Sequence, residues 1–169
     1  MSYKKILVAI DRPPVTPKVY EQALDLAKKE GASLMVFHCH REPSVAEAIP
    51  PIIDPLAGAG LYPTTGTSFG DLQLIQIQRE QLEKEVEQDR EWLQNYCQNA
   101  IARGVPTECD DNVGSPGPHI CDLARDWGAD LIVIGRKGHN VLKEVFLGSV
   151  SNHVIHHAPC SVLVVQDDN

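Results

Sequence analysis

Three glycines and a serine near the end of the chain have a spacing that suits phosphate binding. Gly135-Arg136-Lys137-Gly138 follows a short apolar run, and Gly148-Ser149 comes after nine further residues. Glycine lets the backbone approach a ligand closely, and the amides at a helix N-terminus can bind an anion together with a serine hydroxyl. The spacing matches neither G-x-G-x-x-G nor the Walker sequence, so the phosphate-binding mechanisms of those two motifs are not assumed for this chain. We interpret the pattern as an anion site, with plain turn geometry as the alternative.

A second candidate group consists of His38 and His40, which lie two residues apart at the end of an apolar run. Alternate residues of a strand point to the same face, so the two imidazoles would share a face. They could bind a metal ion as a pair, but the sequence offers no evident third ligand, and we predict no metal site. Three other histidines would lie in the last turns of a helix, where cationic side chains suit the helix dipole. These are His153, His156 and His157.

The five cysteines lie far apart and form no C-x-x-C pair. An odd number without framework spacing argues against a disulfide scaffold and against a thiolate zinc site. We expect them to be small, buried, unpaired residues in a reducing compartment. They are Cys39, Cys97, Cys109, Cys121 and Cys160. Paired carboxylates, a Ser-His-Asp arrangement and a catalytic cysteine setting are not evident either, so whether the chain is an enzyme stays open.

Composition narrows the class of protein. The chain has 169 residues, of which 43% are hydrophobic and 22% charged, as in an ordinary globular domain. With 15 Lys and Arg against 23 Asp and Glu, its net charge is −8, which disfavours nucleic acid as a partner. Its apolar runs are shorter than the roughly 20 residues that span a bilayer, and the first run is too short for a signal peptide. We therefore expect a cytoplasmic protein without a membrane partner.

Strands alternating with helices are predicted to position the candidate residues. Short apolar runs are typical of strands buried on both faces of a parallel sheet, and a more polar strand over 105–113 suits a sheet edge. The other strands are expected at 4–10, 33–38, 130–134 and 161–165, with helices in between. This order predicts an α/β fold with a doubly wound, five-stranded parallel sheet and helices on both faces. In such folds ligands bind outside the carboxyl ends of the strands, where the strand order reverses.

Two segments complete this organisation. A long amphipathic helix is predicted over 71–103, and we expect its apolar face to pack on the sheet. That face would consist of Ile75, Leu82, Val86, Leu93, Cys97 and Ile101. The stretch over about 41–70 is rich in proline and glycine, so we predict an insert without regular structure. It could be a mobile lid, a binding loop or disorder.

The sequence resembles the universal stress protein family. The resemblance rests on the motif G-x-x-G-(nine residues)-G-[ST], on the first strand with Asp11, and on Ala158-Pro159-Cys160 before the last strand. It implies a Rossmann-like, adenine nucleotide alpha hydrolase-like fold, with residues 1–169 as one domain that contains the insert at about 41–70. One departure is Arg12-Pro13-Pro14, because many members have a serine two residues after the aspartate.

The resemblance also implies a nucleotide site. The adenine would lie between the ends of the first two strands, in a pocket lined by Ala9, Asp11 and Cys39, with Asp11 near the ribose or a metal-bound phosphate. The residues expected to wrap the ribose and phosphates are Gly135, Arg136, Gly138 and His139, and those expected to hold the phosphate chain are Gly148, Ser149 and Val150. The ligand would be ATP, ADP or AMP, with Mg²⁺ as a companion of the nucleotide.

The resulting prediction is a cytoplasmic stress-response protein whose bound adenine nucleotide modulates its partner or oligomer interactions. The resemblance implies a homodimer formed through the last strand, residues 161–165. Two alternatives stay open. One is a slow Mg-dependent ATP hydrolase or phosphotransferase, since phosphoryl transfer needs little more than positioning and charge stabilisation. The other is a nucleotide-free scaffold that recruits a protein through the insert and the long helix.

Overall fold

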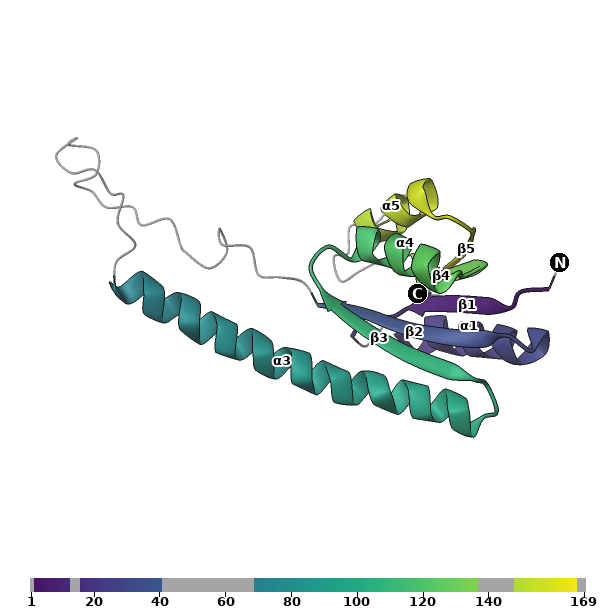
Figure 1. The fold of residues 1–169 in the computed structure, drawn as a ribbon, viewed down its shortest axis with the longest axis horizontal. Helices are drawn as coiled ribbons and strands as arrows, with labels where there is room; N and C mark the ends of the chain where they lie inside the picture. Colours follow the sequence, from purple (N-terminus) through teal and green to yellow (C-terminus); the bar gives the residue numbers. More distant parts are fainter. Residues whose placement is uncertain (1, 13–15, 41–68, 137–147, 167–169) are drawn as a thin grey trace. The chain divides into compact units, whose positions relative to one another are not determined.

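Five parallel strands form one sheet in the order β3-β2-β1-β4-β5 (Figure 1). The structure is a computed structural model that describes residues 2–12, 16–40, 69–136 and 148–166. The strands are β1 (Lys5–Ala9), β2 (Ser33–His40), β3 (Thr107–Val113), β4 (Leu131–Gly135) and β5 (Ser161–Val165). The helices are α1 (Thr16–Glu30), α3 (Phe69–Ala102), α4 (Pro116–Trp127) and α5 (Ser149–His157). The predicted doubly wound, five-stranded parallel sheet is confirmed, and the strand order reverses between β1 and β4.

The sheet is buried on both faces because successive strand residues point to opposite sides. Ile6 and Val8 of β1 join a core cluster with α1 and the C-terminal part of α3. Leu7, between them, joins a second cluster with α4 and α5. Figure 1 shows α4 and α5 on one side of the sheet and α1 on the other. A fully buried branched or aromatic side chain contributes about 1.5–3 kcal/mol relative to an exposed one, so these two clusters fix the faces of every strand.

Local sequence signals set the helix ends. The helix α1 begins at Thr16-Pro17, where proline suits the first helical turn, and it is followed by Gly31 with φ of +65°. The helix α4 ends against Gly128, which adopts the left-handed conformation (φ 75°) and donates its N–H to Ala124 O. Glycine reaches this conformation without the steric cost of a Cβ atom, so both stops follow from the sequence.

Two details differ from the sequence prediction. Strand β2 runs two residues further, through His40, because its end pairs with β3, with His38 opposite Asp111 and His40 opposite Val113. On α3, Ile101 was expected to face the sheet, but 48% of it is exposed. The buried positions of this part of the helix are Asp89, Leu93, Cys97 and Ala100. These positions recur every three or four residues along the side of the helix that faces the sheet, and Ile101 does not lie on that side.

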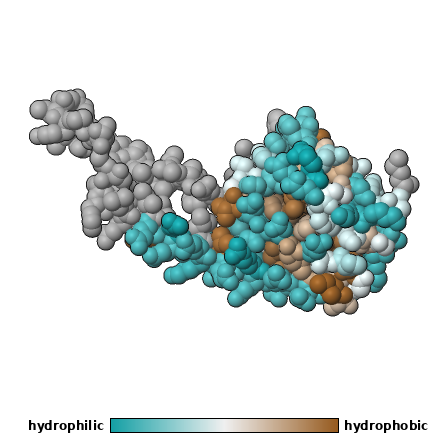
Figure 2. All heavy atoms as spheres, viewed as in Figure 1, coloured by the Kyte–Doolittle hydropathy of each residue, from teal (hydrophilic) through white to brown (hydrophobic). Residues whose placement is uncertain are grey.

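By its internal contacts the chain divides into two compact units, residues 1–41 with 89–169, and residues 42–88. The first unit contains the sheet. Most of the predicted insert, 41–68, lies outside the described residues. Of the second unit the structure describes the beginning of α3, where Arg79 and Glu83 form an i,i+4 ion pair at 3.3 Å. Hydrophilic side chains predominate on the face of α3 visible in Figure 2. None of the described helices combines the length and apolar character that crossing a bilayer requires.

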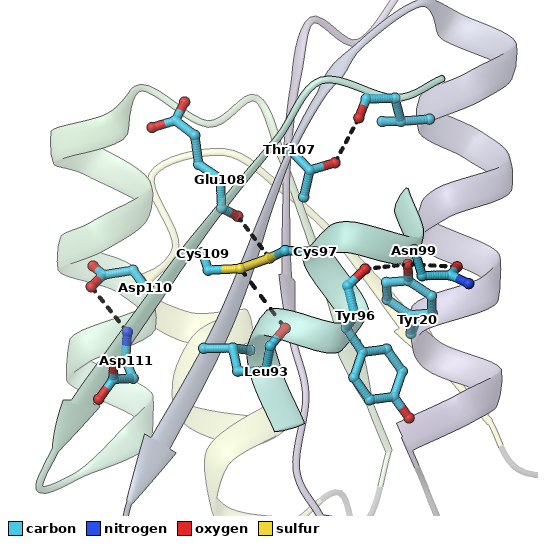
Figure 3. The surroundings of a disulfide bond; sticks show 11 residues. Tyr20, Leu93, Tyr96, Cys97, Asn99, Thr107, Glu108, Cys109, Asp110 and Asp111 are labelled. Carbon is cyan, nitrogen blue, oxygen red and sulfur yellow. Dashed lines mark hydrogen bonds between the residues drawn. A yellow bond between two sulfur atoms is a disulfide. The ribbon is translucent and has the colours of Figure 1, made fainter. Parts of the chain in front are cut away.

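A disulfide joins α3 to β3 through Cys97 and Cys109, whose Cα atoms are 6.3 Å apart (Figure 3). The expectation that all five cysteines are unpaired is therefore wrong for these two. The chain turns back after α3 through Gly104, at φ of +85°, so the inner face of the helix lies over the neighbouring strand. Cys97 and Cys109 are 12 residues apart in the sequence, and this spacing alone does not indicate that they form a disulfide. The other three keep their thiols, with Cys121 buried and Cys39 and Cys160 half-buried.

Candidate functional site

The carboxyl end of β2 presents different chemistry to the two faces of the sheet. Cys39 packs against the apolar cluster under α4 and α5. Its neighbours His38 and His40 point the other way, toward α3, where the rings of His38 and Trp92 are 5.3 Å apart. The alternation of a strand thus separates the predicted nucleotide residue from the two histidines.

Three predicted nucleotide residues lie on the face of the sheet that α4 and α5 cover. Ala9 ends β1, Cys39 lies near the end of β2, and Val150 lies in the first turn of α5. All three are partly exposed and pack against one apolar cluster, which contains Phe37 and Ile134. The cluster lies beside the point where the strand order reverses, which is where open α/β sheets bind ligands. The structure therefore places these three residues on the same apolar face of the sheet.

The ends of the glycine loop are held at the neighbouring strand end. The N–H of Arg136 donates to Val165 O at 2.8 Å, and the N–H of Gly148 donates to Arg136 O at 3.1 Å. The hydroxyl of Ser151 donates to Gly135 O at 2.7 Å. These bonds hold the residues at the end of β4 next to the residues at the start of α5. Gly138 and His139 lie outside the described residues.

The predicted start of a helix at Gly148-Ser149 is confirmed. Gly148 is the N-cap of α5, and Ser149 is its first residue. A glycine at the N-cap has no side chain with which to satisfy the first amides of the helix. Ser149 is exposed, so its hydroxyl lies at the surface beside these amides. This end of α5 therefore combines N–H donors with a hydroxyl in the manner that suits an anion.

Asp11 and Arg136 lie at the same edge of the sheet. Asp11 follows β1, is exposed, and accepts a hydrogen bond from the N–H of Arg12 at 2.8 Å. The half-buried Arg136 places Nη1 3.5 Å from Gln166 Oε1, at the end of β5. Both predicted residues thus stand next to the strand ends.

A buried polar cluster occupies the opposite face of the sheet. We name it the His-Asp cluster; it consists of His38 and His40 of β2 and Asp89 of α3, all buried. Asp89 Oδ2 lies 3.4 Å from His38 Nε2 and 3.1 Å from His40 Nδ1. Arg12 contacts the same carboxylate, with Nε 2.8 Å from Oδ1 and Nη2 2.9 Å from Oδ2. The third potential ligand that the sequence did not reveal is therefore supplied by α3.

The surroundings of the His-Asp cluster determine its protonation. Burial, helped by the neighbouring His38, lowers the pKa of His40, against the opposite influence of Asp89 and Asp111. His40 is therefore neutral at neutral pH. Its Nε2 lies 3.5 Å from Asp111 Oδ2, and this buried nitrogen has no hydrogen-bond partner among the described residues. Arg90 holds Asp111 in turn, with Nε 3.2 Å from each carboxylate oxygen.

Sequence reasoning missed Asp89 although a signal for it exists. Leu93 and Cys97 were assigned to the inner face of the long helix, and Asp89 lies four residues before Leu93 on the same face. A carboxylate in the buried row of a helix requires a polar or charged partner. Extending the row backwards would have placed Asp89 on the side of the helix that faces the sheet. Nothing in the spacing, however, relates residue 89 to His38 across the insert.

The chain is similar to proteins of one family along its whole length. The profile of the "Universal stress protein family" matches residues 2–60 and 61–166. The chain is 45% identical over 166 residues to the universal stress protein Sll1388 of Synechocystis sp., and the match covers 98% of this chain and 99% of that protein.

Solved structures of similar proteins have the same fold. The universal stress protein UspA from Lactobacillus plantarum superposes with a TM-score of 0.72 at 24% identity, covering 98% of this chain and 99% of that one. A universal stress protein in complex with cAMP gives 0.59 at 20% identity, covering 98% of each chain. One from Archaeoglobus fulgidus in complex with dAMP gives 0.54 at 22%, covering 97% and 98%. The expected Rossmann-like, adenine nucleotide alpha hydrolase-like fold is confirmed.

Proposed function

Because this chain belongs to the universal stress protein family, we propose that it binds an adenine nucleotide at the ends of β1, β2 and β4. The observation that carries the proposal is that the partly exposed Ala9, Cys39 and Val150 pack against one apolar cluster on the α4 and α5 face of the sheet. An adenine ring needs such a flat apolar surface, with polar groups at its edge. Two solved proteins of this family are complexes with adenine nucleotides, cAMP and dAMP.

Each predicted residue has a role in this proposal. Ala9 and Cys39 contact the adenine, and Asp11 approaches the ribose or a metal-bound phosphate. The glycines let the backbone approach the phosphates, and the first amides of α5 donate to the phosphate oxygens with the Ser149 hydroxyl. The residues assigned to the ribose and phosphates are Gly135, Arg136, Gly138, His139, Gly148, Ser149 and Val150. The ligand is ATP, ADP or AMP, and Mg²⁺ accompanies the nucleotide when it carries a phosphate chain.

The proposed physiological role is that of a cytoplasmic binding module. Nucleotide occupancy would alter the surface that the chain offers to a partner or to a second copy. The dimer contact is assigned to β5 (Ser161–Val165), which is an edge strand of the sheet. Leu163 in this strand is 38% exposed, and an apolar residue on an unpaired edge suits contact with another chain.

Native mass spectrometry tests the proposal directly. The purified chain is measured alone and with AMP, ADP or ATP, with and without Mg²⁺. We expect one nucleotide per chain. Ser149→Ala should weaken binding by about 10- to 100-fold, since a hydrogen bond to a charged group contributes about 1.5–3 kcal/mol. Ala9→Leu should weaken binding by filling the adenine position.

Ser33→Ala serves as the control for Ser149→Ala, because Ser33 begins β2 at the opposite end of the sheet. A chain that binds none of the three nucleotides, with or without Mg²⁺, would contradict the proposal and favour a nucleotide-free scaffold. If Ser149→Ala binds nucleotide as tightly as the control, Ser149 has no role in phosphate binding, but the rest of the proposal is unaffected.

A further inference from the structure

We propose that the His-Asp cluster is a binding site for a transition-metal ion, with Zn²⁺ as the best match. His38 Nε2, His40 Nδ1 and one oxygen of Asp89 would be the ligands. The site lies on the α3 face of the sheet, whereas the proposed nucleotide site lies on the α4 and α5 face. It does not depend on nucleotide binding.

The distances between the donor atoms fit one small ion. Zn²⁺ takes nitrogen and oxygen ligands at about 2.0–2.2 Å in a tetrahedron, so two ligands on one edge lie about 3.3 Å apart. The two edges that include Asp89 Oδ2 measure 3.1 Å to His40 Nδ1 and 3.4 Å to His38 Nε2. All three donors lie within 4.8 Å of one another. Two edges therefore already match a tetrahedral ion, and the edge between the two imidazole nitrogens must measure about 3.3 Å once the ion is bound.

Each histidine has an acceptor that directs its other nitrogen toward the site. His38 Nδ1 lies 2.9 Å from Ile10 O, and a carbonyl oxygen can only accept, so the proton is on Nδ1. Nε2 is then the ring nitrogen left for a metal ion, and it lies 3.4 Å from Asp89 Oδ2. For His40, a metal on Nδ1 would leave the proton on Nε2, which faces Asp111 Oδ2 at 3.5 Å. Carbonyl and carboxylate partners of this kind orient metal-binding histidines.

One buried nitrogen of the cluster has no hydrogen-bond partner within the described part of the chain. This atom is His40 Nε2. A buried polar atom without a partner is costly. A metal ion on His40 Nδ1 would leave the ring proton on Nε2, where it faces Asp111 Oδ2.

Arg12 competes for the same carboxylate and can give way. Its Nη2 contacts Asp89 Oδ2 at 2.9 Å, while its Nε contacts Oδ1 at 2.8 Å. Binding of the ion to Oδ2 requires Nη2 to move away, whereas Nε can keep its bond to Oδ1, and the Arg12 side chain is 46% exposed. Three protein ligands leave one tetrahedral position for water or an added ligand. Imidazole nitrogens favour Zn²⁺ and its neighbours over Mg²⁺ or Ca²⁺.

Equilibrium dialysis of the full chain, stripped with chelator, tests the site with Zn²⁺ as the probe. We expect one tightly bound ion per chain. His40→Gln and Asp89→Asn should each weaken it more than about 100-fold, since even outer-shell changes cost 10–100-fold. His153→Gln is the matched control, because His153 lies on α5 and stacks on His157. No bound Zn²⁺, or loss in the control equal to that in His40→Gln, would overturn the proposal.

A second measurement keeps the test independent of how the variants fold. Co²⁺ added to the wild-type chain should give the strong visible bands of tetrahedral coordination without a thiolate charge-transfer band. A thiolate band would assign the ion to cysteine and overturn the proposal. The weak spectrum of octahedral Co²⁺ would overturn it as well.

Discussion

At the scale of single residues, Tyr20 shows how burial changes the chemistry of a side chain. It is 2% exposed, and its hydroxyl donates to Tyr96 O at 2.7 Å. The ring also packs edge-on against Tyr96, with centroids 4.6 Å apart. Burial is the main reason that the pKa of Tyr20 rises to about 12. The neutral phenol is thus part of the packing between α1 and α3.

This raised pKa predicts a loss of stability at alkaline pH. An unfolded tyrosine ionises near pH 10, whereas folded Tyr20 keeps its proton until about pH 12. Its contribution is therefore complete below pH 10 and is lost as the pH rises from 10 to 12. We expect the free energy of unfolding of the wild type to fall in this range toward that of Tyr20→Phe.

Urea unfolding at a series of pH values measures this difference. At pH 8, Tyr20→Phe should cost about 1 kcal/mol, the usual net value of one hydrogen bond. Tyr3→Phe removes a phenol from the residues before β1 and is the control. A constant difference between wild type and Tyr20→Phe from pH 8 to 12 would contradict the assignment.

At the scale of elements, the packing of α3 and β3 separates what a sequence can predict from what it cannot. The strands, the sheet type and the start of α5 followed from apolar runs, prolines and glycines, which act locally. The inner face of α3 was predicted correctly at Leu93 and wrongly at Ile101, since both fit helical spacing but only one faces the sheet. The pairing of Cys97 with Cys109, and the approach of Asp89 to β2, depend on tertiary contacts without a local signal.

Leu93 and Ile101 of α3 provide a matched test of which side of this helix packs on the sheet. Leu93 is 2% exposed and Ile101 is 48% exposed. Leu93→Ala should cost about 2–5 kcal/mol because it leaves a cavity in the core. Ile101→Ala should change the free energy of unfolding by less than about 0.5 kcal/mol. Urea unfolding of both variants measures this, and equal losses would show that Ile101 is packed.

The disulfide between α3 and β3 predicts a definite thiol count. Denatured protein alkylated without reductant should gain three groups, on Cys39, Cys121 and Cys160, and with reductant five. Reduction should lower the free energy of unfolding by about 3 kcal/mol, the entropic value for a short closed loop. Cys97→Ala should show the same number of groups with and without reductant. Five groups on the unreduced wild type would exclude the bond.

At the scale of the whole molecule, the proposed dimer contact on β5 leads to a test of assembly. Leu163→Asp places a charge on the exposed edge strand, so we expect it to dissociate the dimer, because desolvating an unpaired charge opposes association. Light scattering after size-exclusion chromatography reports the mass. Ile77→Asp is the control, since Ile77 is 54% exposed on α3. A monomeric wild type, or a dimer unchanged by Leu163→Asp, would move the contact away from β5.

The alternation of side chains at the end of β2 also limits where residues can be inserted into this strand. Cys39 faces α4 and α5, while His38 and His40 face α3, and this sorting depends only on whether a position is odd or even. Inserting one residue in β2 before His38 would send each of the three to the opposite face. A single-residue insertion there should therefore disrupt both proposed sites together.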